Sequence, residues 1–229
     1  MNDEISILLP VYKRNEFLYL FLMNVKSQTY DHTKLTLCID ECESDEPFIR
    51  NIIKKILHPI KVDYRVYKSR SGIGEKRNRL IKNARTKYIQ FMDSDDFYFP
   101  HAIEYNYKLL KERNVKCVGS DKMLFTYTDD NCRMAGINCA DQIHLIHEAT
   151  LFMDRKWFHT TNKFTRRNCG EGKRLFEGIN KKHVAISDVK NVMICICHSD
   201  NTVNKDRFKV ESNEQYLTDD IKEHLEKYC

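Results

Sequence analysis

Glycine and proline are scarce in this chain of 229 residues, which has 7 glycines and 4 prolines. The chain therefore has no Gly/Ser-rich or Pro-rich stretch that could link separate folding units, and collagen-like and low-complexity structures are excluded. The length fits one large domain or two small ones, at roughly 150 residues per domain. The absence of a linker favours one domain.

Long apolar runs are also missing, since no stretch approaches the roughly 20 residues that span a bilayer. The first apolar stretch, Ile5 to Val11, follows Asp3 and Glu4 and contains Pro10. It therefore lacks the basic start and the long apolar region of a signal peptide. The mean hydropathy of -0.59 is that of a soluble protein. We expect a cytoplasmic protein without a transmembrane segment.

Charge and cysteine content are not distinctive. The 38 Lys and Arg residues exceed the 33 Asp and Glu residues by five, a modest excess that is compatible with phosphate, nucleic acid or anionic membranes and names none of them. The 9 cysteines are scattered and odd in number, which predicts reduced thiols in a chain without a secretion signal. Neither Cys38 with Cys42 nor Cys195 with Cys197 has the paired spacing of a zinc module.

Apolar periodicity predicts strands and helices that alternate along the chain. This order predicts an α/β fold with a mostly parallel central sheet and helices on both faces. Between residues 120 and 170 the signal weakens. The predicted strands are 5–11, 35–39, 62–67, 88–92, 115–118, 122–128, 149–153 and 192–197. The predicted helices are 15–28, 47–56, 75–84, one after Pro100, a short one around Leu175 to Ile179, and an amphipathic one from Leu217 to Tyr228.

Three carboxylates follow the predicted strand 88–92 within four residues, at Asp93, Asp95 and Asp96. Carboxylates packed together repel one another, and a hard divalent cation relieves the repulsion by accepting their oxygens. In extended chain Asp93 and Asp95 point the same way, so they can share one ligand. The alternative is a solvated acidic loop in which Asp95 or Asp96 caps the next helix.

Other polar residues stand at or between the ends of the earlier strands. An aromatic ring such as Tyr12 can stack on a base, a carboxylate such as Asp40 can accept from a base N–H, and Arg77 can neutralise phosphate. Neither a GxxxxGK[ST] nor a GxGxxG pattern is present. The alternative for Arg14, Lys76 and Arg77 is an ordinary surface charge. The joint placement of these side chains with Tyr12 and Asp40 at successive strand ends favours a nucleotide site.

In their order and spacing, the segments ILLPVYKR, Asp40 to Asp45, GIGEKRN and YIQFMDSDD resemble the nucleotide-sugar half of family 2 glycosyltransferases with the GT-A fold. The resemblance covers residues 4 to 100 well and about 145 to 204 more loosely. It implies one GT-A-like domain over 1–204, with a nucleotide-sugar-binding half to about 118 and an acceptor-side half from about 119. Residues 205–229 then form a C-terminal amphipathic helix or tail.

The resemblance also implies roles for single residues. Pro10 and Tyr12 match the start of the base site, Asp40 matches the carboxylate that accepts from uracil, and Arg77 matches a basic residue near the nucleotide. Asp93 matches the ribose or metal-proximal member of the DxD motif, and Asp95 and His198 match residues that hold or approach the metal. Arg14 and Lys76 fall near the diphosphate. Glu171 lies where the family carries its catalytic base, and here Gly172 replaces the second acid of the family's pair.

These roles predict an inverting, metal-dependent transfer of a sugar from a UDP-sugar to a hydroxyl of a glycan or another acceptor, with Mn²⁺ or Mg²⁺. The segments around His147 and Trp157 fall where acceptor contacts occur in such enzymes, and Trp157 can offer a platform for a sugar ring or pack in a core. A nucleotidyltransferase is the nearest enzymatic alternative. A non-catalytic nucleotide- or nucleic-acid-binding protein on the same fold is the other, although nucleic acid is not the expected partner.

Overall fold

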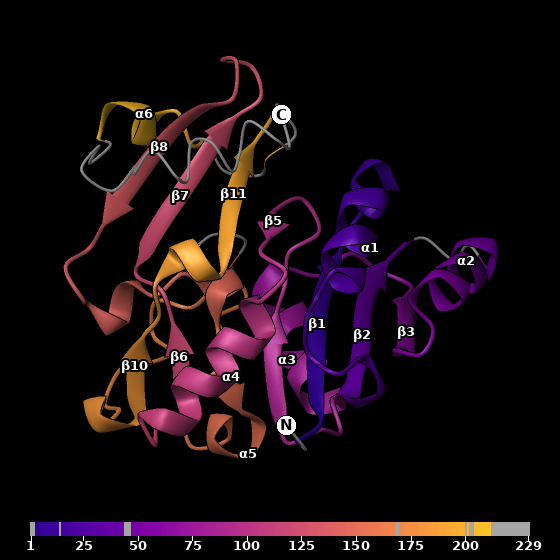
Figure 1. Ribbon diagram of the computed structural model, residues 1–229, viewed down its shortest axis with the longest axis horizontal. Helices are drawn as coiled ribbons and strands as arrows, with labels where there is room; N and C mark the ends of the chain where they lie inside the picture. Colours follow the sequence, from indigo (N-terminus) through magenta and orange to yellow (C-terminus); the bar gives the residue numbers. More distant parts are fainter. Residues whose placement is uncertain are drawn as a thin grey trace.

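The structure is a computed structural model that describes residues 3–13, 15–43, 47–167, 170–199, 201 and 204–211. In these residues the chain forms two sheets, with the helices packed mainly around the larger one (Figure 1). The central sheet contains β1 (Ile5–Val11), β2 (Leu35–Cys42), β3 (Lys61–Tyr67), β4 (Tyr88–Phe91), β6 (Cys117–Gly119), β9 (Phe152–Asp154) and β10 (Val184–Ile186). The smaller sheet contains β5 (Phe97–Tyr98), β7 (Lys122–Tyr127), β8 (Arg133–Asn138) and β11 (Met193–Cys197).

The helices of the described residues are α-helical or short 3₁₀ segments. The α-helices are α1 (Leu18–Lys26), α2 (Pro47–Leu57), α3 (Ile73–Asn83), α4 (Ala102–Glu112), α5 (Arg155–Phe158) and α6 (Arg207–Val210). The 3₁₀ segments are η1 (Asn15–Phe17), η2 (His32–Lys34), η3 (Ile143–Leu145), η4 (Glu148–Thr150), η5 (Lys181–His183) and η6 (Val189–Asn191).

The central sheet has the strand order β10-β6-β9-β4-β1-β2-β3. Its described strands are parallel except β9, which runs antiparallel to both β4 and β6. The register places Pro10 of β1 opposite Asp40 of β2. Because parallel strands end at the same edge of a sheet, the segments that follow β1, β2 and β4 lie together. The predicted α/β fold with a mostly parallel sheet is confirmed.

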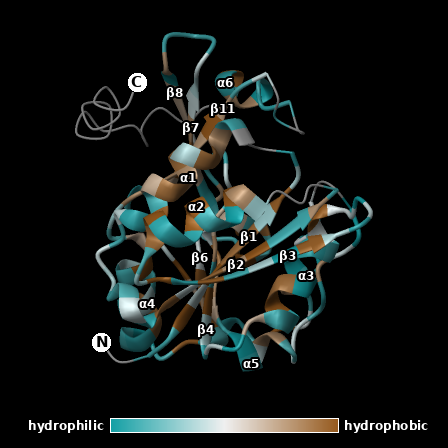
Figure 2. Ribbon diagram, turned by 90° about the vertical axis from the view of Figure 1, so that its right-hand side faces the viewer, coloured by the Kyte–Doolittle hydropathy of each residue, from teal (hydrophilic) through white to brown (hydrophobic). Residues whose placement is uncertain are grey.

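Alternate residues of the central strands build two hydrophobic cores. Ile5, Ile7 and Leu9 of β1 point to one face, where they pack in a cluster with the buried residues of α1, α2 and α4. Leu8 points to the other face and packs in a second cluster with Leu80 of α3. Figure 2 shows hydrophobic residues along the strands and on the inward sides of these helices. β1 reads as a mostly continuous apolar run because both of its faces are covered.

The sequence does not predict the smaller sheet as a separate layer. The structure pairs β11 with β7 in parallel and with β5 in antiparallel, and β8 joins β7 as a hairpin. β7 and β11 coincide with predicted strands. β5 has two residues and β8 is only partly buried, so neither carries the apolar run on which the prediction of a strand depends.

Three local predictions differ from the structure. The strand predicted at 149–153 begins only at Phe152, because Glu148–Thr150 forms a 3₁₀ turn. The helix predicted around Leu175 to Ile179 is a run of turns, closed by i to i−3 bonds such as Leu175 N–H to the Gly172 carbonyl. Cys132 is disulfide-bonded, so the expectation of reduced thiols is wrong there. The predicted helix from Leu217 to Tyr228 lies outside the described residues.

Candidate active site

A cavity of about 400 Å³ opens beyond the C-terminal ends of β1 and β4, where α3 and the smaller sheet approach each other. Open α/β sheets bind ligands at this edge. Most of the residues predicted for the site line the cavity. They are Pro10, Tyr12, Lys76, Arg77, Asp93, Asp95, His147 and Glu171. Side chains that are up to 161 residues apart in the sequence are therefore brought to one place.

Arg77 lies at the centre of this site. It projects from α3, and its side chain is 3% exposed. Nη2 donates to Asp93 Oδ2 at 3.0 Å, and Nε donates to Glu171 Oε1 at 3.1 Å. Burial alone would lower the pKa of Arg77, but Asp93 and Glu171 together raise it above the ordinary arginine value. A buried charge is tolerated only when it is paired in this way.

Two polar atoms in this cluster have no partner within the described residues. Arg77 Nη1 and Asp93 Oδ1 are buried, and neither makes a hydrogen bond there. Buried polar groups in proteins are almost always hydrogen-bonded, so such a pair calls for an explanation. One atom is a donor and the other is an acceptor, which is the combination that a sugar hydroxyl satisfies.

The three acidic residues after β4 have different partners, because the chain turns at Ser94 and Asp95 instead of continuing in the extended form. Asp93 binds Arg77. Asp95 Oδ2 lies 3.4 Å from His198 Nε2. Asp96 is buried, and its Oδ1 accepts from the backbone N–H of Ile196 in β11. Burial raises the pKa of Asp96 well above the usual value, and the Lys205 charge opposes this shift.

Asp95 and His198 are the residues that could hold a metal ion. Within the described ranges, no three His, Cys, Asp or Glu side chains gather closely enough to form a metal site by themselves. The Asp95 and His198 pair therefore fits an ion that takes its remaining ligands from a substrate. Mg²⁺ in phosphate-transfer sites is held by one or two carboxylates together with substrate phosphates, and Asp95 offers one such carboxylate.

Glu171 closes the cavity on the side of the turns that follow residue 170. Its backbone carbonyl accepts from the Thr165 N–H at 2.9 Å. Thr165 in turn packs against Gly74 of α3, where a Cβ on residue 74 would overlap the Thr165 carbonyl. Glu171 is 5% exposed. Burial raises its pKa, the Arg77 charge lowers it, and the Glu148 charge raises it again. The net direction is upward, which suits a proton acceptor.

Tyr12, Arg70 and Lys76 form another part of the cavity wall. The Arg70 guanidinium lies 4.4 Å from the Tyr12 ring centroid, and Lys76 Nζ lies 5.7 Å from it. The Tyr12 hydroxyl donates to Glu43 Oε2 at 3.1 Å. Lys76 donates to the Val11 carbonyl, and burial lowers its pKa. This wall combines an aromatic face with positive charge.

Asp40 lies beside the cavity and does not line it. It is 1% exposed, and Arg79 grips both of its oxygens, from Nε to Oδ2 and from Nη2 to Oδ1, each at 2.8 Å. The Arg79 guanidinium also stacks on the Tyr67 ring at 3.9 Å. The sequence predicts Asp40 as a ligand of the base, and the structure gives it a protein partner instead of an open carboxylate. Arg14 lies outside the described residues.

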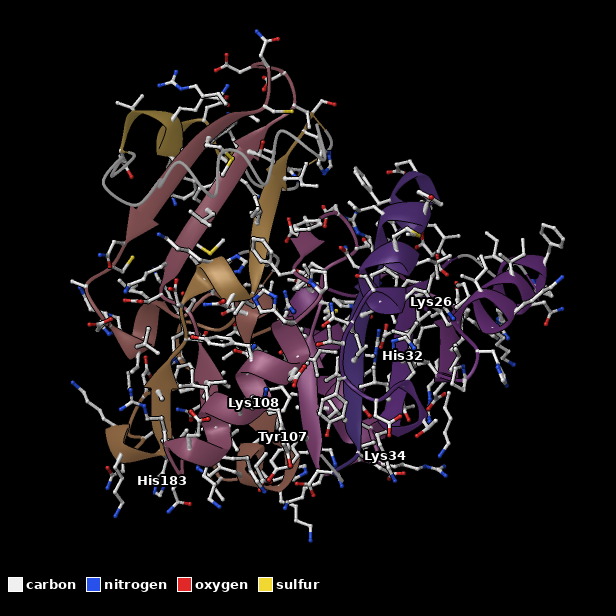
Figure 3. All side chains as sticks on the ribbon, in the orientation of Figure 1. Lys26, His32, Lys34, Tyr107, Lys108 and His183 are labelled. Carbon is white, nitrogen blue, oxygen red and sulfur yellow. The ribbon has the colours of Figure 1, made fainter. Side chains whose placement is uncertain are left out.

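The two predicted acceptor residues have different surroundings. His147 lines the cavity, and burial lowers its pKa to about 4, so the ring is neutral at pH 7. Trp157 of α5 does not reach the cavity. It follows β9, which is antiparallel to β4, and so lies near the start of β4 at the far edge of the sheet. Its ring is 6.4 Å from that of His183, which Figure 3 labels at the lower left. The structure gives an acceptor platform at Trp157 no support.

Two charged residues with a place in this site, Arg79 and Lys205, are missed by sequence reasoning, and a third, Glu148, is covered only as part of the segment around His147. Glu148 lines the cavity beside Glu171, Arg79 binds Asp40, and Lys205 donates to Cys195 Sγ at 2.7 Å. For Glu148 the signal was its position after His147. Arg79 and Lys205 belong to segments rich in other basic residues, so their partners could be found only from the fold.

The family model described as Glycosyl transferase family 2 matches residues 6–178. Among curated relatives, the poly(ribitol-phosphate) beta-N-acetylglucosaminyltransferase TarP of Staphylococcus aureus (strain N315) is 30% identical over 113 residues, which is 48% of this chain and 34% of TarP. The chain spans between 16% and 43% of the length of the curated relatives it matches.

Solved structures show the same fold at low identity. S. aureus TarS 1–349 in complex with UDP-GlcNAc has a TM-score of 0.64 at 13% identity, covering 90% of this chain and 63% of that one. The mannosyltransferase PcManGT from Pyrobaculum calidifontis, in complex with GDP-Man and Mn²⁺, has a TM-score of 0.64 at 13% identity, covering 92% and 60%. The fold is that of the GT-A glycosyltransferases. Among the described helices, none has the length and apolar character needed to cross a membrane.

Proposed function

Since this chain belongs to glycosyl transferase family 2, we propose that it moves a sugar from a UDP-sugar to an acceptor hydroxyl, with inversion and with the help of a divalent metal ion. The observation that carries this proposal is the cluster in which Arg77 joins Asp93 to Glu171. One buried guanidinium thereby holds a carboxylate of the nucleotide side and a carboxylate of the acceptor side at a fixed separation. The UDP-GlcNAc complex of TarS supports the choice of a UDP-sugar.

On the donor side, we place the base against Tyr12 and Pro10. We place the diphosphate near Lys76 and, from the sequence, near Arg14. Asp40 supports this side from beside the cavity, where Arg79 binds both of its oxygens. The unpartnered Arg77 Nη1 and Asp93 Oδ1 offer a donor and an acceptor to a hydroxyl of the ribose or the donor sugar.

Asp95 and His198, with Asp93 close by, are the residues proposed to hold a Mn²⁺ or Mg²⁺ ion. Such an ion neutralises the charge that develops on the diphosphate as it leaves. The Mn²⁺ complex of PcManGT supports this part of the proposal. Asn201 Nδ2 lies 2.8 Å from His198 Nε2, and the Asn201 Oδ1 accepts from the His198 backbone N–H at 2.9 Å, so Asn201 contacts both the ring and the backbone of His198.

On the acceptor side, Glu171 is the proposed base. A hydroxyl of a glycan or another acceptor attacks the sugar from the face opposite the diphosphate, and Glu171 removes its proton in the same step, which gives inversion. A carboxylate in this role contributes typically about 10² to 10⁴-fold to the rate. The upward shift of the Glu171 pKa supports this assignment, because it makes the carboxylate a better proton acceptor.

The test is a panel of nucleotide sugars, beginning with UDP-GlcNAc, read by release of free UDP with Mn²⁺ or Mg²⁺ present. We expect one UDP-sugar to be turned over, and Glu171→Gln to lower its turnover by about 10² to 10⁴-fold while UDP affinity survives. Glu177→Gln is the matched control, because Glu177 is an exposed glutamate paired with Arg174 on the same run of turns. Unchanged turnover in Glu171→Gln would remove Glu171 as the base.

Two other outcomes would replace the proposal. Release of pyrophosphate from a nucleoside triphosphate, with no turnover of nucleotide sugars, indicates a nucleotidyltransferase. Salt-sensitive binding of oligonucleotides that UDP does not affect indicates a nucleic-acid-binding protein. A cytoplasmic location is part of the proposal, and fractionation of the expressing cells tests it.

A further inference from the structure

Gly172 stands directly after Glu171, at the position where the resemblance to the family leads one to expect a second acid. Its backbone N–H donates to Glu148 Oε1 at 2.8 Å. Glu148 comes from η4, 24 residues earlier in the chain, and lines the cavity together with Glu171. A second carboxylate is therefore present beside Glu171, although it comes from another segment.

The space around Gly172 explains why this position is a glycine. Its backbone is outside the left-handed region, since the described glycines with positive φ are Gly170 and Gly178, so the backbone conformation does not demand a glycine. A Cβ on residue 172 would lie 2.5 Å from Glu148 Oε1, 2.7 Å from Cγ and 2.9 Å from Cδ. The carboxylate of Glu148 thus occupies the space that a side chain at 172 would take.

The charges that face Glu148 make this pocket acidic. Glu171 and Arg77 surround it, with Asp93 on the far side of Arg77 and the neutral ring of His147 as its neighbour in the chain. The Arg77 guanidinium donates hydrogen bonds to Asp93 and Glu171, and the Glu148 charge also acts on it. Glu148 Oε1 is held by the Gly172 N–H, and within the described residues no ion pair fixes the carboxylate further. The half-buried side chain is therefore oriented by its backbone bond and still open to the cavity.

We propose that Glu148 supplies the second acceptor-side carboxylate, and that it accepts a hydrogen bond from a neighbouring hydroxyl of the acceptor, which orients the acceptor so that the attacking hydroxyl points its proton at Glu171. This inference rests on the proposed glycosyl transfer. In that step the hydroxyl oxygen bonds to the anomeric carbon, the bond from that carbon to the diphosphate oxygen breaks, and UDP leaves with the electron pair. The proton goes to Glu171. Glu148 is unchanged by the step and sets the direction of attack.

A carboxylate swap tests the inference. Glu148→Ala is expected to lower turnover of UDP-GlcNAc, or of the donor that the panel identifies, by about 10- to 100-fold, the value of a hydrogen bond to a charged group. Gly172→Asp alone is expected to be at least as damaging, because the new side chain overlaps Glu148. Glu148→Ala combined with Gly172→Asp removes the overlap and returns a carboxylate to the same space. The double variant should therefore turn over the donor about tenfold faster than Glu148→Ala alone.

The readouts separate this inference from the proposed function. Donor affinity, measured by titration calorimetry with UDP-GlcNAc and Mn²⁺, should be alike in wild type and Glu148→Ala, and Glu177→Gln should match wild type throughout. Wild-type turnover by Glu148→Ala, or a double variant no better than the single ones, overturns the role of Glu148 and leaves the proposed function standing. A wild-type protein that turns over no nucleotide sugar overturns both. A crystal structure offers a check without activity, since a Glu148 carboxylate turned away from Gly172 also overturns the inference.

Discussion

The two sides of the cavity hold their carboxylates in different ways. On the side proposed for the donor, Asp40 and Asp93 each bind an arginine of α3, at Arg79 and Arg77. On the side proposed for the acceptor, Glu171 shares Arg77 with Asp93, and Glu148 accepts from a backbone N–H. Within the described residues, the acceptor side thus has two carboxylates, and the cation paired with one of them, Arg77, is also paired with Asp93 of the donor side.

This difference separates the tasks of the two sides. Carboxylates that are each paired with an arginine are compensated in charge when buried, and they can present fixed acceptors to a nucleotide. Glu171 keeps a raised affinity for protons, because burial raises its pKa, the Arg77 charge only partly opposes this, and the nearby Glu148 charge adds to it. A positive, oxocarbenium-like sugar and a departing proton are both stabilised by such an excess of negative charge.

Arg77→Met should have the largest effect, because it removes the cation that the two sides of the cavity share. Asp93 and Glu171 would be left buried without a partner, and breaking a buried pair in this way costs about 3–5 kcal/mol of unfolding free energy. We expect this loss in urea unfolding, together with loss of transfer activity. Adding Glu171→Gln should restore part of the stability and none of the activity.

The control for Arg77 is Arg174→Met, which removes the same group from an exposed pair. Arg174 Nε lies 3.1 Å from Glu177 Oε2, about as close as Arg77 to Glu171, but both side chains are more than half exposed. Exposed pairs are worth at most about 1 kcal/mol. Equal losses in the two variants would show that burial of Arg77 does not set its importance.

Asp95→Asn should affect the donor side alone. It weakens the Asp95 and His198 pair without touching Arg77 or Glu171. We expect UDP to bind at least about tenfold more weakly in the presence of Mn²⁺, a loss of about 1.4 kcal/mol, and the effect of Mn²⁺ on binding to disappear. Titration calorimetry with and without Mn²⁺ measures both. The exposed Asp141→Asn is the control, and a metal effect that survives in Asp95→Asn would remove Asp95 as a ligand.

The donor side was also the more predictable one. β1 to β4 could be located from the sequence because each is a short run with its own apolar pattern, followed by a helix with a clear apolar stripe. The acidic segment after β4 was found for the same reason, since it ends a buried strand. The extended conformation assumed for it was wrong, because the turn at Ser94 and Asp95 sends Asp93 and Asp95 to different partners.

The acceptor side could be predicted only in part. Glu171 was found through the resemblance of its segment to a family, whereas Trp157 was chosen by residue type and lies at the opposite edge of the sheet. The partnership of Glu148 with Gly172 joins residues 24 positions apart through a backbone bond and an absent side chain. Hydrophobic periodicity does not reveal such a contact. The sequence alone shows only that Gly172 stands where the family resemblance implies a second acid.

The smallest expected effect is on pH dependence, and it tests whether the acceptor-side carboxylates act on each other. Glu171 must be ionised to accept a proton, so the rate should rise as pH rises through its pKa. Burial raises that pKa first, Arg77 opposes the shift, and the Glu148 charge adds to it, with Asp93 and His147 the other titratable neighbours. Glu148→Gln keeps the shape and removes the charge. The acidic limb of the pH–rate profile should therefore move to lower pH, while Glu177→Gln leaves it in place. A limb that stays fixed or moves to higher pH would mean that the charge of Glu148 does not act on Glu171. The negative charge on the acceptor side would then be neutralised as fully as that on the donor side.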